Sequence, residues 1–161
     1  TVIVPKLIGS TYFSSNSKLS SKSLNDENVF LEQISANKAN SSLDLIDKID
    51  EWAVEKQLHF KYNDGKTATR QYRLDNDKNT LLCSTTSKGE ISFRLGELNK
   101  ILSTEGYKDL FTFLETTFGN TIFAKPKDEE AGPQFASIAI SNITQSELSK
   151  LLEKFEDIFE I

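Results

Sequence analysis

Two amphipathic helices stand out in the pattern of apolar and polar positions. Apolar residues recur at helical spacing between residues 41 and 56 and share one face: Leu45, Ile49, Trp52 and Ala53. Ser41 and Asp44 have the spacing of a capping box at the start of this segment. A second stripe follows Thr144 and Glu147, which have the same spacing, and it consists of Leu148, Leu151, Leu152, Phe155, Ile158 and Phe159. Both segments are predicted to be helices.

Four short runs between these helices have the character of β-strands, and they cover residues 58–62, 69–74, 80–85 and 90–95. In the last run, Ile91, Phe93 and Leu95 alternate with polar residues, which is typical of a sheet with one face in water. The connections are short and carry turn signals such as Asp64-Gly65. Because they are too short for crossovers, the sequence predicts an antiparallel meander.

Weaker patterns fill the rest of the C-terminal part. Residues 28–36, 98–102 and 107–118 have helical character, and Gly119 is the expected end of the third of these helices. Residues 135–140 have extended character. We therefore predict an α+β fold, in which an antiparallel β-meander of about four strands has helices packed on one face.

The N-terminal part has a different composition. Residues 2–8 have strand character, but Pro5 restricts them to an edge strand. Seven of the sixteen residues from 10 to 25 are Ser, and so few apolar side chains do not offset the cost of ordering the backbone. We predict an N-terminal extension and Ser-rich linker over residues 1–42, followed by an α+β domain over residues 43–161.

Length and composition limit the class of protein. The chain has 161 residues and a formal net charge of −5, which fits one ordinary globular domain. Its single cysteine, Cys83, excludes an internal disulfide and favours a reducing, cytoplasmic location. No apolar run approaches the roughly 18 residues of a membrane helix, so no membrane partner is expected. Because the chain begins at Thr1 and contains no Met, we interpret it as part of a larger protein or as a chain whose start was removed.

Two motifs near the first predicted turn are candidate chemical sites. Gly65-Lys66-Thr67 is similar to the end of a phosphate-binding loop, but Phe60 stands where that loop needs a glycine. Asp64 and Lys66 have the spacing of the last element of a metal-dependent nuclease site. A structural Asp-Gly turn is the preferred interpretation of that pair.

Other reactive side chains are few. His59 is the only histidine, so it and Cys83 do not provide the several ligands of a zinc site. A catalytic dyad of these two residues stays open, although packing or surface roles are preferred. The run Asp128-Glu129-Glu130 is interpreted as a solvated loop. We predict no catalytic residue, no metal site and no cofactor.

Charge placement is the most informative feature. Residues 56–100 hold nine of the nineteen basic residues and only five acidic ones, a net charge of +4. All three arginines lie there, interleaved with aromatic residues: Phe60, Tyr62, Tyr72 and Phe93. A sheet face with such side chains is expected to bind phosphates and stack bases of DNA or RNA. The alternative is an ordinary solvated sheet face with charges across from charges.

Strand alternation predicts which basic side chains share the open face. Along the second strand, Arg70 and Tyr72 point one way, while Gln71 and Arg73 point the other. If Tyr72 faces the core, Arg73 shares the open face with Arg94. Arginine suits such a face because its planar head can engage a phosphate with two hydrogen bonds. The predicted nucleic-acid-binding residues are Arg73, Arg94, Lys61 and Lys66.

Four motifs together resemble a recurring bacterial module: Ile49-Asp50-Glu51-Trp52-Ala53, Gln57-Leu58, Asp64-Gly65-Lys66, and Gly89 followed by Ile91-Ser92-Phe93. The module has a helix ending in an E-W-A-like run, a G-K turn, a short sheet and a C-terminal stretch similar to residues 137–159. The resemblance covers about residues 43–160. It departs at Tyr62-Asn63-Asp64, where the module carries a Trp and a Gly. The module looks like an accessory unit of prokaryotic proteins, some of restriction or DNA-defence type. This implies a nucleic-acid setting and assigns no catalytic residue.

These observations support one functional hypothesis and two alternatives. The hypothesis is a non-enzymatic accessory module of a larger prokaryotic nucleic-acid-handling protein, which binds phosphates through a basic sheet face. The first alternative is a protein–protein interaction or dimerisation module, because the last apolar stripe, with Phe155 and Phe159, exceeds what one sheet face covers. The second is a metal-dependent nuclease centred on Asp64.

Overall fold

The structure is a computed structural model that describes residues 26–36, 40–63, 66–124 and 132–161. Five α-helices lie in these ranges: α1 (Glu27–Ala36), α2 (Asn40–Glu55), α3 (Leu95–Ile101), α4 (Thr104–Phe118) and α5 (Gln145–Phe159). The strands are β1 (His59–Tyr62), β2 (Thr69–Arg73), β3 (Leu81–Thr86), β4 (Glu90–Phe93) and β5 (Ala136–Ala139). Two short 3-10 helices, η1 (Asn120–Ile122) and η3 (Ile140–Asn142), flank β5.

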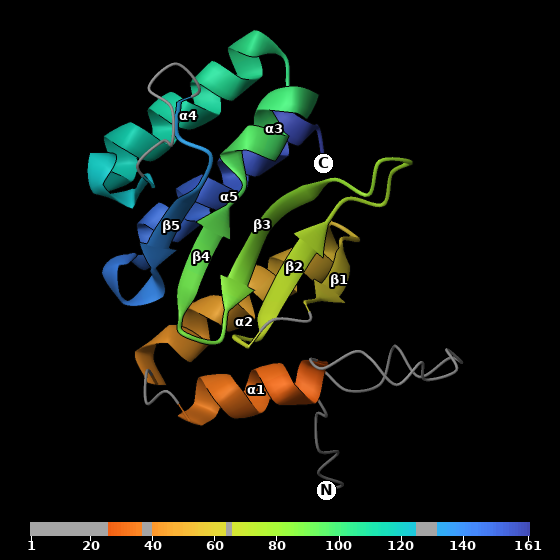
Figure 1. Cartoon of the computed structure of the whole chain (residues 1–161), viewed down its shortest axis with the longest axis vertical. Coiled ribbons are helices and arrows are strands. Elements are labelled where there is room, and N and C mark those ends of the chain that lie inside the picture. Colours follow the sequence, from red (N-terminus) through yellow and green to blue (C-terminus); the bar gives the residue numbers. More distant parts are fainter. Residues whose placement is uncertain (1–25, 37–39, 64–65, 125–131) are drawn as a thin grey trace, which may run out of the picture.

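The strands form one antiparallel sheet in the order β1-β2-β3-β4-β5 (Figure 1). The α+β class and the meander from β1 to β4 are confirmed. The sheet has a fifth strand because the chain returns after α3 and α4 and places β5 beside β4. Residues 135–140 were predicted to be extended, but their pairing with β4 was not predicted. The two segments lie about 45 residues apart, and a contact over that distance leaves no signal in the local sequence.

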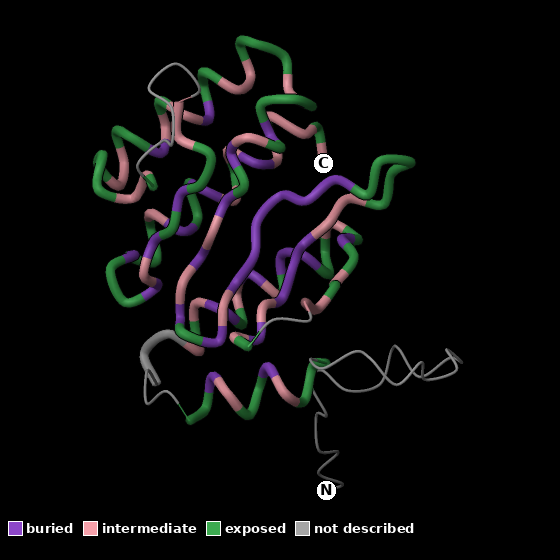
Figure 2. Tube along the Cα trace, in the orientation of Figure 1, coloured by how far each residue is buried: buried purple, intermediate pink, exposed green. Residues whose placement is uncertain are grey.

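Helices cover one face of the sheet, as predicted. Figure 1 shows β2, β3 and β4 in front of α2 and α5. We call the face toward these two helices the inner face and the opposite one the outer face. The inner face shares a core with the apolar stripes of the helices, and its largest fully buried side chains include Tyr72, Phe30, Phe93, Phe155 and Ile49. In Figure 2 burial is concentrated along β2 and β3, while the turn between them is exposed.

The packed domain includes α1, which the sequence prediction assigned to the N-terminal extension. Phe30 and Ile34 of this helix are buried in the common core. The side chain of Gln33 accepts hydrogen bonds from the Ala68 amide (3.0 Å) and the Ser87 hydroxyl (2.7 Å). Helix α1 therefore closes the end of the β2–β3 hairpin. The Ser-rich segment and the predicted strand over residues 2–8 lie outside the described residues.

The C-terminal helix follows its predicted pattern. The hydroxyl of Thr144 accepts from the Glu147 amide, and the Glu147 carboxylate accepts from the Thr144 amide, which confirms the capping box. Of its apolar stripe, Phe155 is fully buried and Phe159 is half-buried against it, with 6.1 Å between the ring centroids. Much of the stripe that motivated the dimerisation hypothesis is therefore used within one chain.

A buried cation joins the helices to the sheet. Arg70 of β2 has only 5% of its side chain exposed and forms a hydrogen-bonded ion pair with Asp50 of α2. The Tyr72 hydroxyl donates to the other Asp50 oxygen (2.7 Å). Although burial lowers it, the pKa of Arg70 is raised by Asp50. Burial raises the pKa of Asp50, while Arg70 and Tyr72 oppose that shift.

The same guanidinium group contacts two further elements. Arg70 Nε donates to the Tyr62 hydroxyl of β1 (3.1 Å), and Nη2 lies 3.6 Å from the Glu27 carboxylate of α1. The central carbon atom of the guanidinium group (Cζ) also lies 4.6 Å from the centre of the Phe30 ring, a cation–π contact. Arg70 thus connects α1, α2, β1 and β2 in one network.

We predict that Arg70→Met destabilises the fold strongly, because it leaves the Asp50 carboxylate in the core without its cation. Removal of one partner of such a pair costs about 3 kcal/mol of unfolding free energy or more. Urea titration followed by the fluorescence of Trp52, the single tryptophan, measures this change.

Arg94→Met is the matched control, because Arg94 is exposed and its replacement should change the unfolding free energy by no more than about 0.5 kcal/mol. The double variant Arg70→Met with Asp50→Leu should recover part of the stability, since no buried charge then remains. Equal midpoints for the two single variants would contradict a central role of the Arg70 network.

Candidate functional site

The outer face is organised in rows that run across the strands. One row, which we call the polar row, crosses all five strands through directly paired positions: Lys61, Gln71, Ser84, Ser92 and Ser137. The Ser84 and Ser92 hydroxyls are hydrogen-bonded to each other at 3.1 Å. Gln71 and Ser84 are buried and Ser92 is half-buried, whereas Lys61 and Ser137 are exposed at the two ends. The row carries three hydroxyl groups and has a cation at one end.

Two arginines lie beside the polar row. Arg73 ends β2, and Arg94 directly follows β4, so they are two strands apart. Burial, and next the positive charge of Arg94, lowers the pKa of Arg73, while Glu97 opposes this shift. On neighbouring-but-one strands of the same sheet, their backbones are separated by two strand spacings, roughly 10 Å. We call Arg73 and Arg94 the arginine pair.

Local contacts hold the arginine pair in place. Arg73 donates from Nε and Nη2 to the Gln71 side-chain oxygen (both 3.0 Å) and from Nη1 to the Asn79 carbonyl (2.7 Å). Arg94 pairs with the Glu97 carboxylate at 2.9 Å. An arginine has five N–H groups, so the three bonds of Arg73 to described residues leave donors for a ligand.

A depression of about 350 Å³ lies at the corner of the sheet next to Arg73. It is lined by His59, Phe60, Lys61, Arg73, Leu74 and the turn residues Asp75, Asn76 and Asn79. His59 forms an exposed pair with Asp75 at 3.0 Å. The depression extends the basic surface of Lys61 and Arg73 toward the edge of the sheet.

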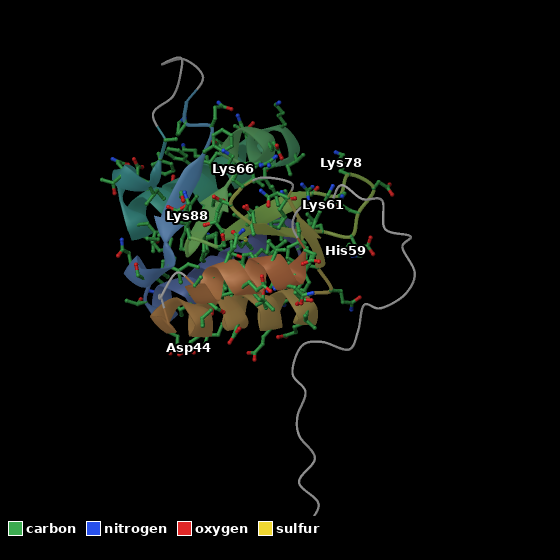
Figure 3. The ribbon with its side chains drawn as sticks, turned by 60° about the horizontal axis from the view of Figure 1, so that its bottom comes forward. Asp44, His59, Lys61, Lys66, Lys78 and Lys88 are labelled. Atoms are coloured by element: carbon green, nitrogen blue, oxygen red, sulfur yellow. The ribbon has the colours of Figure 1, made fainter. Side chains whose placement is uncertain are left out.

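The structure brings together three of the four predicted nucleic-acid-binding residues. Lys61, Arg73 and Arg94 share the same half of the outer face. Lys66 lies in the β1–β2 connection, at the other end of β2, which is roughly 13 Å from Arg73 along the strand. Figure 3 shows Lys61 and Lys66 on the side of the sheet away from Asp44 of α2. Neither lysine forms an ion pair with another described residue.

The aromatic residues of this segment do not lie with the arginines on the outer face, so the expected combination of arginines and aromatic rings on one face is not found. The inward orientation of Tyr72 and Phe93 is the one that strand alternation required. Tyr72 binds Asp50 beneath the sheet, and the Phe60 ring packs edge-on against Tyr72 at 5.5 Å. Tyr62 packs against Phe30, and Phe93 against Phe155. They point inward because they alternate with the outward polar residues. They therefore contribute mainly to the core, and of the four only Phe60 also lines the depression beside Lys61 and Arg73.

An aromatic residue that sequence reasoning missed does lie on the outer face. Phe135, just before β5, is 55% exposed. Ala136 and Ile138 of β5 are buried, whereas Ser137 is exposed, so alternation places Phe135 on the side of Ser137. The signal was present in the pattern of residues 135–138. It could not be read without knowledge of which face of β5 is buried.

The structure does not bring the other candidate catalytic residues together. His59 is exposed and pairs with Arg73 of the outer face, whereas Cys83 is buried and pairs with Tyr72 of the inner face. The two side chains therefore lie on opposite faces of the sheet and cannot form a catalytic dyad. Asp64 and residues 128–130 lie outside the described residues. Among the residues that the structure describes, no group of three or more His, Cys, Asp or Glu side chains could hold a metal ion.

Comparison of the chain with protein-family models, curated proteins and solved structures finds no match. Among the described helices, none has the length and apolar character needed to cross a membrane.

We predict that Cys83 is unreactive in the native protein. Burial raises the pKa of its thiol to about 12, and only the thiolate is nucleophilic. Alkylation by iodoacetamide at pH 8, followed by mass spectrometry, should be at least about 100-fold slower in the folded than in the urea-unfolded chain. Cys83→Ser is the blank, and a comparable rate in the folded protein would reopen a catalytic role for this thiol.

Proposed function

We propose that the domain binds the phosphate backbone of nucleic acid through the outer face of the sheet. In this proposal it is a non-enzymatic accessory module of a larger prokaryotic protein of restriction or defence type. The observation that carries the proposal is the arginine pair beside the polar row of the outer face.

The arginine pair concentrates positive charge at one end of the outer face. Like charges repel, and Glu97 of α3 balances only part of the combined charge of Arg73, Arg94 and Lys61. A bound phosphate would relieve that repulsion and accept charge-assisted hydrogen bonds from both arginines. The fixed orientation of Arg73 lowers the entropic cost of binding.

The polar row supplies the second kind of contact that a phosphate backbone uses. Hydroxyl and amide side chains provide many protein hydrogen bonds to phosphate and sugar oxygens. Ser92 and Ser137 lie on β4 and β5, directly beside the strand end that carries Arg94. Small side chains there leave room for a ligand backbone to approach the sheet.

Charge polarity across the domain supports the same orientation. Helix α2 carries five acidic residues and one basic residue, and α5 carries four acidic and two basic ones. These helices lie beneath the inner face, opposite the basic side chains (Figures 1 and 3). A polyanion is therefore steered toward the outer face and away from the helices. The bacterial-module resemblance supports the nucleic-acid setting.

The test is binding of labelled single-stranded and duplex oligonucleotides, measured by fluorescence anisotropy across a salt series. We expect binding at low salt that weakens linearly in log affinity against log salt concentration. Replacement of both Arg73 and Arg94 by Ala should weaken binding and reduce the salt slope by about one unit for each phosphate that the variant no longer neutralises.

The control is Lys108→Ala with Lys150→Ala, which removes the same charge from exposed positions on α4 and α5. Its salt slope should stay at the wild-type value. Absence of binding at low salt, or equal behaviour of the two double variants, would refute the proposed function.

A further inference from the structure

Phe135 is unusual among the aromatic residues that the structure describes. It is the only one of them that is exposed, and it belongs to neither the core nor the partly buried side chains packed on it. The other exposed large apolar side chains are aliphatic and lie on helices: Leu31, Val54 and Ile101. A large exposed ring on a face that also carries two arginines offers a ligand an apolar stacking surface beside positive charge.

The sheet register places this ring next to the arginine pair. Phe93 and Ala136 form the last pair between β4 and β5, and Arg94 and Phe135 are the residues immediately beyond that pair. Opposite residues of an antiparallel pair point to the same face. Arg73, Arg94 and Phe135 thus follow one another across the sheet, on β2, after β4 and before β5.

The backbone around Phe135 is held on both sides. Its carbonyl accepts from the Ala124 amide (2.9 Å), and the neighbouring Gln134 carbonyl accepts from the Gly96 amide (3.1 Å). A Cβ atom at Gly96 would lie 2.0 Å from the Gln134 side-chain oxygen, so glycine allows this close approach. The ring is therefore presented from an anchored segment beside the start of α3.

An exposed ring next to two phosphate-binding cations suits an unpaired base. In a duplex the faces of the bases are stacked inside the helix, whereas a single strand can turn a base onto an aromatic side chain. We infer that the outer face takes single-stranded nucleic acid, with a base stacked on Phe135 and the adjoining phosphates held by Arg73 and Arg94. This inference rests on the proposed function and specifies its ligand.

The experiment compares Phe135→Ala, Phe135→Leu and Phe135→Trp in binding to an oligothymidylate and to a duplex of equal length. Removal of one base–aromatic stack should weaken single-strand binding by roughly 5- to 150-fold in the Ala and Leu variants. The Trp variant, which keeps a stacking ring, should bind the single strand at least as tightly as the wild type. Duplex affinity, which depends on phosphate contacts, should stay unchanged in all three variants.

Val54→Ala is the matched control, because Val54 is 64% exposed on α2, away from the outer face. Urea titration of each variant confirms that the fold is retained, and Phe135→Leu keeps most of the apolar volume if Phe135→Ala does not fold.

Unchanged single-strand affinity in Phe135→Leu, or an equal decrease for single strand and duplex, would overturn the inference. In that case, the proposed function still stands without the stacking inference if replacement of both Arg73 and Arg94 by Ala weakens binding of nucleic acid relative to the wild type. Absence of all binding by the wild type would overturn both.

Discussion

The buried charge of Arg70 is the constraint on which the rest of the arrangement depends. A guanidinium group with almost no access to solvent needs an anion and several hydrogen-bond acceptors, and only the side of the sheet that faces α2 supplies them through Asp50. Once Arg70 points inward, strand alternation sends Tyr72 inward as well. Gln71 and Arg73 must then point outward. One ion pair therefore sets the orientation of β2 and, through its partners, of the whole sheet.

The division into two faces explains the chemistry of both. Aromatic rings and the buried network lie on the inner face, where helices exclude water and strengthen each polar contact. The outer face keeps small hydroxyl groups in its centre, the arginine pair beside them and one exposed ring next to Arg94. A surface of this kind contributes little to stability, and its positive charge matches the nucleic-acid ligand that we propose. Acidic helices behind the sheet give the domain the polarity that such a ligand would follow.

Much of the candidate site was predictable, because alternation in a strand is a local property. The pattern of β2 and β4 was enough to assign Arg73 and Arg94 to one face. Alternation also places Tyr72 and Phe93 on the face opposite Arg73 and Arg94, but it does not by itself say which of the two faces packs against the helices. Phe135 was missed for a related reason. The position of Phe135 on the outer face depends on the pairing of β5 with β4, a contact between segments separated by two helices.

The sequence by itself determined most of the secondary structure, the antiparallel meander of the first four strands, the capping of the last helix and the concentration of basic residues in one segment. These follow from turn chemistry and periodicity, which act over a few residues. The fourth strand was predicted too long, because α3 already begins at Leu95. Only the tertiary structure decided that β5 completes the sheet, that α1 belongs to the domain, that Arg70 is a core residue and that His59 and Cys83 lie on opposite faces. Each of these depends on contacts between distant segments, whose energy comes from burial and pairing rather than from local propensity.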